Sequence, residues 1–291
     1  MARFFVDELP VEGSQYMLTG ENAAHAKVLR LKPGEEVTLC DGRGTDCLCR
    51  VEGDLTLRAG ASLPCPAEPR TRVTLYLAYP KADKAEHVIQ KAVELGAAEI
   101  VLFPSRYCVS RPDDKSLGKK LERWQRIARS AAEQSRRGVI PAVRAADSYA
   151  NAIEEAAKAD VPVLFYENES GYSLHEALAT FPSCHSERPK GLASRRSEES
   201  VLPRVGERIA TTGVRTGLAM TGSEAGAAGG CALRAPTVAL MTGAEGGFSE
   251  EEIARARAAG MKICTLGPRI LRCETAPLAG LTAVLYGLGE I

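Results

Sequence analysis

Hydrophobic and polar positions follow two different patterns along the chain, and the pattern changes near residue 70. Before that point, the short runs "RFFV", "EEVTLC", "DCLCRV" and "DLTLRA" predict strands that are separated by Asp-Gly and Gly-Asp turns. The run "ENAAHAKVLR" predicts a short helix that ends before Pro33 and Gly34. Several short strands with such turns predict a small β-barrel.

From Arg72 onward, continuous apolar runs alternate with amphipathic stretches. The runs "RVTLYLAY", "EIVLFP", "VPVLFYE", "TVALM" and "KICTL" predict five buried strands. Helices are predicted at about 84–95, 116–137, 250–259 and 276–288, and Gly96 ends the first of them. This alternation predicts an α/β fold with a mainly parallel sheet that is covered on both faces.

One long segment fits neither pattern. Residues 184–234 contain no aromatic side chain and no sustained apolar period, and Gly, Ser, Arg and Glu dominate them. Such a composition cannot bury enough surface to offset its ordering entropy, so a disordered insertion is predicted. The proline-rich stretch "LPCPAEPR" predicts a linker. The expected domains are therefore a barrel at 1–68 and an α/β domain at 70–291.

The composition narrows the class of protein mainly by exclusion. The 291 residues carry 37 Lys or Arg and 37 Asp or Glu, so any nucleic acid must be held by a local patch. No run reaches the roughly 18 apolar residues of a membrane span, and "MARFFVDELP" lacks a signal peptide's apolar core. The nine cysteines match no zinc spacing. We expect a cytoplasmic protein with reduced thiols, no metal and no membrane contact.

The stretch "MTGAEGGFSEEEI" carries the first candidate site. Its glycines follow a predicted strand, where ligands of open α/β sheets bind, and Ser249 with Glu252 forms a capping box. Adjacent glycines allow a ligand to approach the backbone, although a tight turn without a ligand would also explain them. The spacing is neither G-x-G-x-x-G nor a P-loop, which disfavours a nicotinamide cofactor and a nucleoside triphosphatase.

The stretch "LGPRILRCETAPLAGL" follows the last predicted strand and reaches the same edge of the sheet. Gly267 and Pro268 predict a loop, and Thr275 is expected to cap the final helix. Arg272 and Glu274 therefore lie in a loop beside the glycines. A local ion pair that closes the loop is the structural alternative to a catalytic role.

These two stretches resemble the RsmE family of the SPOUT class, which comprises ribosomal RNA small subunit methyltransferases that methylate N3 of a uridine in 16S rRNA. The segments "RFFVDE", "HAKVLRLKPGEEVTLCDGRG", "KADKAEHVIQKAVELGAAEIVLFPSRYCV" and "RWQRIARSAAEQSRR" are also similar to that family, in the same order. The likeness covers nearly the whole chain apart from the insertion. The family usually has Pro at the position of Ala244 and Gly at that of Arg136.

The resemblance implies a PUA-like, RNA-binding barrel and a SPOUT domain with a trefoil knot. It also implies a homodimer that binds S-adenosyl-L-methionine in the knot. The implied cofactor-binding residues are Leu164, Glu167, Thr242, Gly243, Gly246, Gly247, Leu266, Gly267, Ile270 and Leu271.

The chemistry of methyl transfer suggests roles for the two charged residues. Uridine N3 becomes a nucleophile only when its proton leaves, and the negative charge then spreads onto two carbonyl oxygens. A fixed guanidinium can stabilise that charge with two donors, so Arg272 is the catalytic candidate. Glu274 is expected to orient Arg272 or to cap the last helix. The sequence does not identify the general base.

A basic run provides the candidate surface for 16S rRNA or the small ribosomal subunit. Residues 106–144 contain eleven Lys or Arg against four Asp or Glu, which predicts either a solvated face or a track of phosphate contacts. The alternative function is a non-catalytic RNA-binding protein with a PUA-like domain. The predicted RNA-binding residues are Arg3, Lys27, Arg30, Lys119, Arg123, Arg126 and Arg136.

Overall fold

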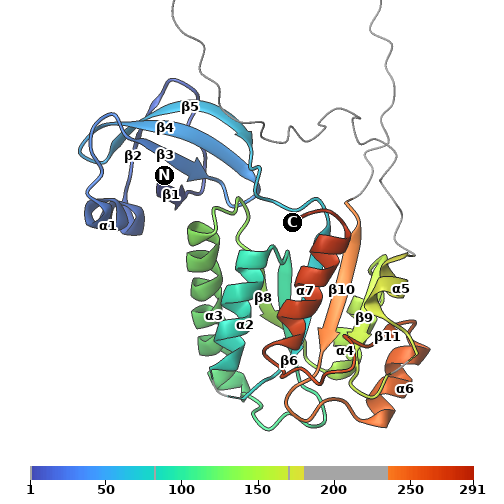
Figure 1. Ribbon diagram of the computed structural model, residues 1–291. Coiled ribbons are helices and arrows are strands. Elements are labelled where there is room, and N and C mark those ends of the chain that lie inside the picture. The colour runs from blue at the N-terminus through green and yellow to red at the C-terminus, as the bar shows by residue number, and fades with distance from the viewer. Residues whose placement is uncertain (1, 82, 170, 180–234) are drawn as a thin grey trace, which may run out of the picture. The chain divides into compact units, whose positions relative to one another are not determined.

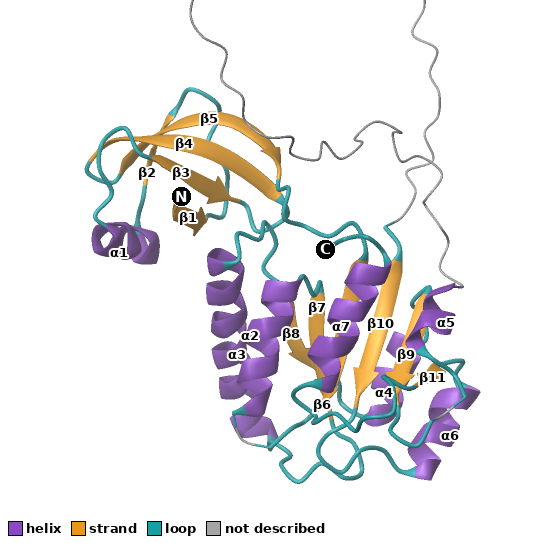
Figure 2. Ribbon diagram, in the orientation of Figure 1, coloured by secondary structure: helices purple, strands orange, loops and turns teal. Residues whose placement is uncertain are grey.

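Two β-sheets with their helices make up the part of the chain that the computed structural model describes, residues 2–81, 83–169, 171–179 and 235–291 (Figures 1 and 2). The predicted insertion at 184–234 lies outside these residues. The N-terminal elements are β1 (Ala2–Phe5), β2 (Gln15–Met17), α1 (Gly20–Leu29), β3 (Glu36–Cys40), β4 (Thr45–Gly53) and β5 (Thr56–Pro64). The later elements are β6 (Arg72–Ala78), α2 (Lys84–Leu95), β7 (Glu99–Phe103), α3 (Asp114–Gln134), β8 (Ala142–Ala145), α4 (Tyr149–Ala156), β9 (Val161–Phe165), α5 (Leu174–Ala179), β10 (Thr237–Thr242), α6 (Glu250–Ala258), β11 (Lys262–Cys264) and α7 (Ala276–Gly287).

The N-terminal sheet confirms the predicted small β-domain. Its strand order is β1-β3-β4-β5-β2; β1 pairs parallel with β3 and the other pairs are antiparallel. Alternate side chains of β4 point inward, where Cys47, Cys49 and Val51 join Phe4 and Leu57 in a buried core. Register shifts between β4 and β5 help these long strands bend. The sheet is a curled half-barrel with β1 and β2 as its edges.

The second sheet confirms the predicted parallel α/β architecture. Its order is β11-β9-β10-β6-β7-β8, and all five pairings are parallel. Helices α2, α3, α5 and α7 cover one face with Val88, Ala128 and Leu281, whereas α4 and α6 cover the other with Ile153 and Ile253. The chain runs from β6 to β8 in one direction and then crosses to the other side of β6. This switch leaves the carboxyl ends of β9, β10 and β11 open to a ligand.

The elements that the sequence analysis did not predict are short. Helix α2 has the predicted bounds and ends at Gly96, whose φ of +110° suits glycine. The sequence did not predict β2, β8, α4 or α5. Of the four residues of β8, only Val143 is buried, so no apolar run marks this strand. The implied trefoil knot and the domain boundary at residues 68–70 stay predictions.

Helix α3 ends before the predicted Arg137 because Arg136 leaves the helical conformation. The φ of Arg136 is +63°, and the backbone N–H of Arg137 donates to the carbonyl of Ala132 at 2.9 Å. A left-handed residue after a helix is usually glycine, because a Cβ atom costs energy in this conformation. The glycine that the family usually has at this position would adopt the same left-handed conformation without strain.

We therefore expect Arg136→Gly to raise the free energy of unfolding by about 1 kcal/mol, since relief of left-handed strain outweighs the added entropy of the unfolded chain. Urea denaturation measures this difference. Lys120→Gly, in the exposed middle of α3, is the matched control and should lower the same quantity by about 1 kcal/mol. A loss of stability in Arg136→Gly would show that the arginine side chain outweighs the backbone strain.

Candidate active site

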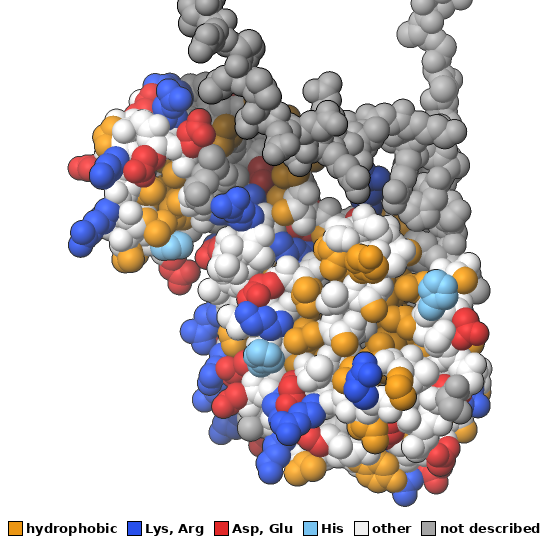
Figure 3. All heavy atoms as spheres, viewed as in Figure 1, with side chains coloured by type: hydrophobic (Ala, Val, Ile, Leu, Met, Phe, Trp, Pro, Cys, Tyr) orange, Lys and Arg blue, Asp and Glu red, His pale blue; other side chains and the backbone are white. Residues whose placement is uncertain are grey.

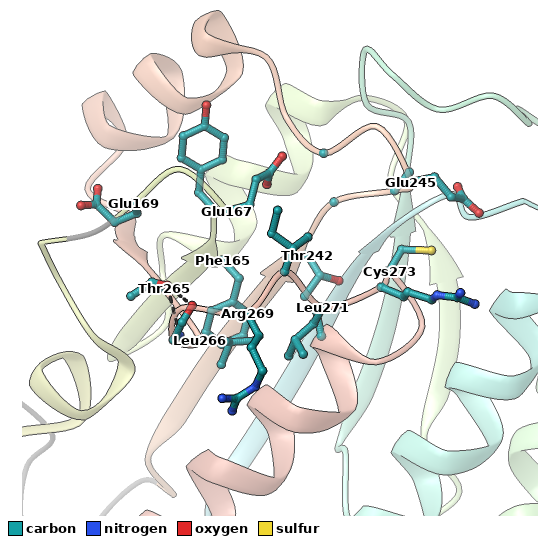
Figure 4. A pocket seen from close by; sticks show the side chains of 18 of the residues that line it. Phe165, Glu167, Glu169, Thr242, Glu245, Thr265, Leu266, Arg269, Leu271 and Cys273 are labelled. Atoms are coloured by element: carbon teal, nitrogen blue, oxygen red, sulfur yellow. Dashed lines mark hydrogen bonds between the residues drawn. The ribbon is translucent and has the colours of Figure 1, made fainter.

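A pocket of about 820 Å³ opens at the carboxyl edge of the second sheet (Figure 4). The segments that follow β9, β10 and β11 form it, together with the first residue of α2. This volume lies within the range of nucleotide- or drug-sized ligand sites. The lining residues are Lys84, Phe165, Tyr166, Glu167, Glu169, Thr242, Gly243, Ala244, Glu245, Gly247, Thr265, Leu266, Gly267, Pro268, Arg269, Ile270, Leu271, Arg272, Cys273 and Ala276.

Residues 243–248, which we call the glycine loop, form one wall. The N–H of Gly247 donates to the carbonyl of Ala244 at 3.0 Å, and the φ of Gly247 is +64°. A Cβ atom on Gly247 would collide with the carboxylate of Glu167, so glycine is required by both conformation and space. The predicted capping box of Ser249 and Glu252 is confirmed and fixes the start of α6 directly after the loop.

Residues 265–275, which we call the arginine loop, form the opposite wall. Leu266 and Leu271 are half-buried and face the cavity together with Phe165 (Figure 4). Gly267 has a φ of +106°, and its N–H donates to the hydroxyl of Thr265 at 3.1 Å, which fixes the bend. These side chains provide an apolar slot next to backbone polar groups, which is the kind of surface that an adenine ring needs.

Thr275 does not cap the last helix in the predicted way. It stands at the N-cap of α7 with a helical backbone, and its side chain makes no capping hydrogen bond. The N–H groups of Thr275 and Ala276 instead donate to the carbonyl of Arg272, at 2.8 and 2.9 Å. The arginine loop therefore passes into α7 through a backbone turn, and Pro277 occupies the first turn, where its missing N–H costs no hydrogen bond.

Most of the predicted site residues line this pocket, and three do not. Leu164 is fully buried in the core, because alternate residues of β9 face opposite sides of the sheet. Gly246 lies behind the pocket wall, where an added Cβ atom would stand 2.6 Å from the Cβ atom of Tyr107. Glu274 lines a neighbouring hollow beside α7. The individual roles of the predicted residues stay predictions.

Arg272 and Glu274 form at most a loose pair. Their closest N–O distance is 4.0 Å and the Arg272 side chain is 84% exposed, so an ion pair contributes little here. The Oε2 atom of Glu274 lies 3.1 Å from Nζ of Lys84. The pKa of Glu274 falls to about 2 because its carboxylate accepts hydrogen bonds from its own backbone N–H and from the Cys273 thiol, with Lys84 adding to the effect. Such a carboxylate is a poor general base at neutral pH.

We expect Glu274→Gln to keep the shape of the wild-type pH–rate profile for methyl transfer between about pH 6 and 8, because Glu274 stays ionised throughout that range. Because folding lowers the pKa of Glu274, the carboxylate stabilises the folded protein at pH values above its ordinary pKa of about 4.5. This stabilisation is lost as the pH falls toward about 2. Single-turnover rates over pH measure the first effect. Loss of an inflection near neutrality in the variant would identify Glu274 as the titrating group.

Most of the predicted RNA-binding side chains are exposed. Lys119, Arg126 and Arg136 are exposed, as are Lys27 and Arg30 on and beside α1. Figure 3 shows Lys and Arg side chains along the side of the second domain that carries α3.

Two of the predicted RNA-binding side chains already pair with a carboxylate. Arg3 is half-buried and its side chain, only 9% exposed, donates two hydrogen bonds of 2.6 Å to Asp46, which argues against its predicted contact with RNA. Arg123 is exposed, and its guanidinium pairs with Glu86 at 2.7 Å. The phosphate track, if it forms, therefore rests mainly on the exposed residues.

The sequence did not single out several residues that line the pocket. Lys84 comes from α2, and Glu245 and Cys273 lie between predicted residues of the two loops. The two loop residues could have been inferred from the loops themselves. Lys84 carries no such local signal, because it appears in the sequence only as the first residue of a helix.

Comparison with known proteins agrees with the fold. The family description of an RNA methyltransferase domain matches residues 67–187 and 212–285, and that of an RNA methyltransferase PUA domain matches residues 18–56. The curated ribosomal RNA small subunit methyltransferase E of Bacillus subtilis (strain 168) is 29% identical over 294 residues, which cover 98% of this chain and 96% of that protein. The protein of the same name from Mycobacterium bovis is 31% identical over 285 residues, with 97% and 90% covered.

A solved structure extends the likeness to three dimensions. The crystal structure of a ribosomal RNA small subunit methyltransferase E from Neisseria gonorrhoeae, bound to S-adenosyl methionine, has a TM-score of 0.70 and 26% identity, and the match covers 98% of this chain and 97% of that chain. Fold and pocket thus define an RNA methyltransferase of the SPOUT type with a PUA domain. Within this class, the chain belongs to the RsmE family.

Proposed function

We propose that the protein transfers a methyl group from S-adenosyl-L-methionine to N3 of a uridine in 16S rRNA of the small ribosomal subunit, acting in the cytoplasm. The observation that carries the proposal is the pocket, in which the glycine loop and the apolar slot meet the exposed guanidinium of Arg272. The names of the relatives support an rRNA substrate, and the ligand of the Neisseria gonorrhoeae structure supports the cofactor.

The residues of the pocket fit this cofactor in size and chemistry. Gly243 and Gly247 line the pocket without side chains, and an added Cβ atom would crowd the glycine loop at Gly243 or collide with Glu167 at Gly247. Glu167 lies at the end of β9 beside Gly247, and among the described residues no hydrogen bond to its carboxylate is seen. A carboxylate in this position can accept hydrogen bonds from ribose hydroxyls. Leu266 and Leu271 would then contact the adenine.

The cofactor supplies a methyl group on a sulfonium, and an in-line displacement moves it to nitrogen. The N–C bond would form as the S–C bond breaks, the neutral thioether would leave, and the N3 proton would pass to solvent water. The task of the protein is then to align the groups and to stabilise the negative charge on the uracil carbonyl oxygens. Arg272 is the side chain that we assign to that charge, because it lines the pocket and its guanidinium is not held by a close carboxylate.

We also propose that the protein acts as a homodimer. Helix α7 supports this arrangement, because its outer face exposes Tyr286 and Ala283 next to the half-buried Leu278. Apolar side chains gather over this part of the surface in Figure 3. An exposed apolar face of this kind is typical of an interaction surface. Sedimentation equilibrium would measure the mass of the assembly, and a monomer at all concentrations would contradict the proposal.

The function can be tested by incubating the purified protein with small ribosomal subunits that lack the modification and with S-adenosyl-L-methionine labelled in its methyl group. The rRNA is then digested to nucleosides and analysed by mass spectrometry. The proposal predicts labelled 3-methyluridine in 16S rRNA. Tight binding to the RNA without any methyl transfer would instead support the non-catalytic RNA-binding alternative.

A further inference from the structure

The ammonium of Lys84 connects the two loops that form the pocket. Its Nζ atom lies 3.1 Å from Oε1 of Glu245, in the glycine loop, and 3.1 Å from Oε2 of Glu274, in the arginine loop. It also lies 3.6 Å from the sulfur of Cys273. The N–H of Lys81 donates to Oε1 of Glu245 at 3.0 Å, so Lys81 and Lys84 both hold the same carboxylate oxygen of the glycine loop.

This cluster is partly shielded from solvent, to about the same degree as the pair of Lys91 and Glu94 on the same helix. The side chains of Lys84, Glu245 and Glu274 are 35%, 28% and 22% exposed, and those of Lys91 and Glu94 are 40% and 27% exposed. The two carboxylates raise the pKa of Lys84 through hydrogen bonds, and the pKa of Glu274 falls to about 2. All three groups therefore stay charged at neutral pH. Without the ammonium, two carboxylates would face each other across the pocket rim.

Lys84 and Arg272 are alternative partners for the same carboxylate. Glu274 lies 3.1 Å from Lys84 and only 4.0 Å from Arg272. If Lys84 were absent, Glu274 would gain from closing the remaining gap to Arg272. The guanidinium would then be drawn toward the rim and away from a uracil in the pocket.

We propose that Lys84 is a positioning residue for methyl transfer: it joins the glycine loop to the arginine loop through Glu245 and Glu274 and so keeps the Arg272 guanidinium available to the substrate. This inference rests on the proposed function for its effect on rate. The joining of the loops is a separate property that can be measured without any substrate.

The experiment compares Lys84→Met, Lys84→Arg and Lys91→Met with the wild type. Lys91 is the matched control, because it lies on the same helix with 40% exposure and pairs with Glu94 in the next turn. Lys84→Met should lower the single-turnover rate about 100-fold, as a misplacement of about 1 Å does. Lys84→Arg keeps a cation between the carboxylates and should recover most of the rate, and Lys91→Met should match the wild type.

A second variant separates the positioning role from a contact with substrate. In Lys84→Met/Glu274→Gln, the competing carboxylate is neutral, so Arg272 should be freed and the rate should rise at least about threefold above that of Lys84→Met alone. A rate in Lys84→Met within about threefold of the wild type would overturn the proposal. Equal losses in Lys84→Met and Lys84→Arg, with no rescue by Glu274→Gln, would overturn it as well, since the ammonium itself would then be needed.

Amide hydrogen exchange provides the readout that does not depend on activity. Residues 243–248 and 265–275 should exchange faster in Lys84→Met than in Lys91→Met or the wild type, because both loops lose their shared partner. Unchanged exchange in both loops would contradict the joining role. If the wild type transfers no methyl group at all, the proposed function fails, and the exchange measurement still decides whether Lys84 joins the loops.

Discussion

Arg272→Lys is expected to lower the single-turnover rate of methyl transfer by about 100- to 1,000-fold, which corresponds to the loss of one donor aimed at developing charge. An ammonium cannot present the planar pair of donors that a guanidinium offers to two oxygen atoms. The affinity for S-adenosyl-L-methionine should change far less, because the proposed role of Arg272 is to act on the uracil. Rapid-quench methylation assays beside calorimetric titrations measure the two quantities.

The matched control for this variant is Arg50→Lys. Arg50 and Glu36 form an exposed pair with an N–O distance of 4.0 Å, which is also the distance between Arg272 and Glu274, and they lie on the first sheet, outside the lining of the pocket. Both substitutions should leave the melting temperature nearly unchanged, since exposed pairs contribute little. A wild-type rate in Arg272→Lys, combined with a lower melting temperature, would make the arginine a structural residue of the loop.

Gly247→Val is expected to weaken the binding of S-adenosyl-L-methionine by about 10- to 100-fold, at about 1.4 kcal/mol for each factor of ten. The φ of Gly247 is +64°, and its new side chain would displace the carboxylate of Glu167 from the pocket wall. Loss of the hydrogen bonds that we propose between that carboxylate and the ligand accounts for most of the expected change. Calorimetric titration of the variant measures it.

Gly260→Val separates backbone strain from the effect on the pocket. Gly260 has a φ of +88° in the turn after α6, and an added Cβ atom would meet no heavy atom within 4 Å. Both variants should lose stability to left-handed strain, by about 1–2 kcal/mol or more for a β-branched side chain. Only Gly247→Val should lose affinity. Equal affinities in the two variants would show that the glycine loop is a turn without a role in binding.

The main strands and helices of the fold could be predicted from the sequence because their apolar residues recur with the period of the element. The runs that became β6, β7, β9, β10 and β11 are continuous and buried on both faces, which is the pattern of a parallel sheet. Strand β8 was not predicted because it is short and only Val143 among its residues is buried. Helix α4 did have a local signal that was overlooked, because Ser148 caps it and its buried residues Tyr149, Ala152, Ile153 and Ala156 follow helical spacing.

The place of the site followed from the glycine cluster and from the position of both loops after strands. The direction of each side chain did not follow, which is why Leu164 was expected in the pocket and lies in the core. The bridge from Lys84 to Glu245 and Glu274 joins three separate parts of the sequence, so no spacing rule could reveal it.

In the basic run, residues 106–144, counting Lys and Arg along the sequence overstated the positive charge that is exposed on the surface. Arg137 is buried against Glu68 at 2.7 Å, and Arg144 is bound by both Glu99 and Glu155. These acidic partners come from other parts of the chain. The charge available to RNA is thus smaller than the sequence count indicates, and it is concentrated on the exposed side chains of α3.

The central claim is that the pocket between the glycine loop and the arginine loop binds the methyl donor. A crystal structure of the protein grown with S-adenosyl-L-methionine tests this claim most directly. The account predicts density for the cofactor between Gly243 and Leu271, with the adenine against Leu266 and the methyl group on the side of Arg272. Density for the cofactor elsewhere on the protein, with this pocket filled only by solvent, would contradict it.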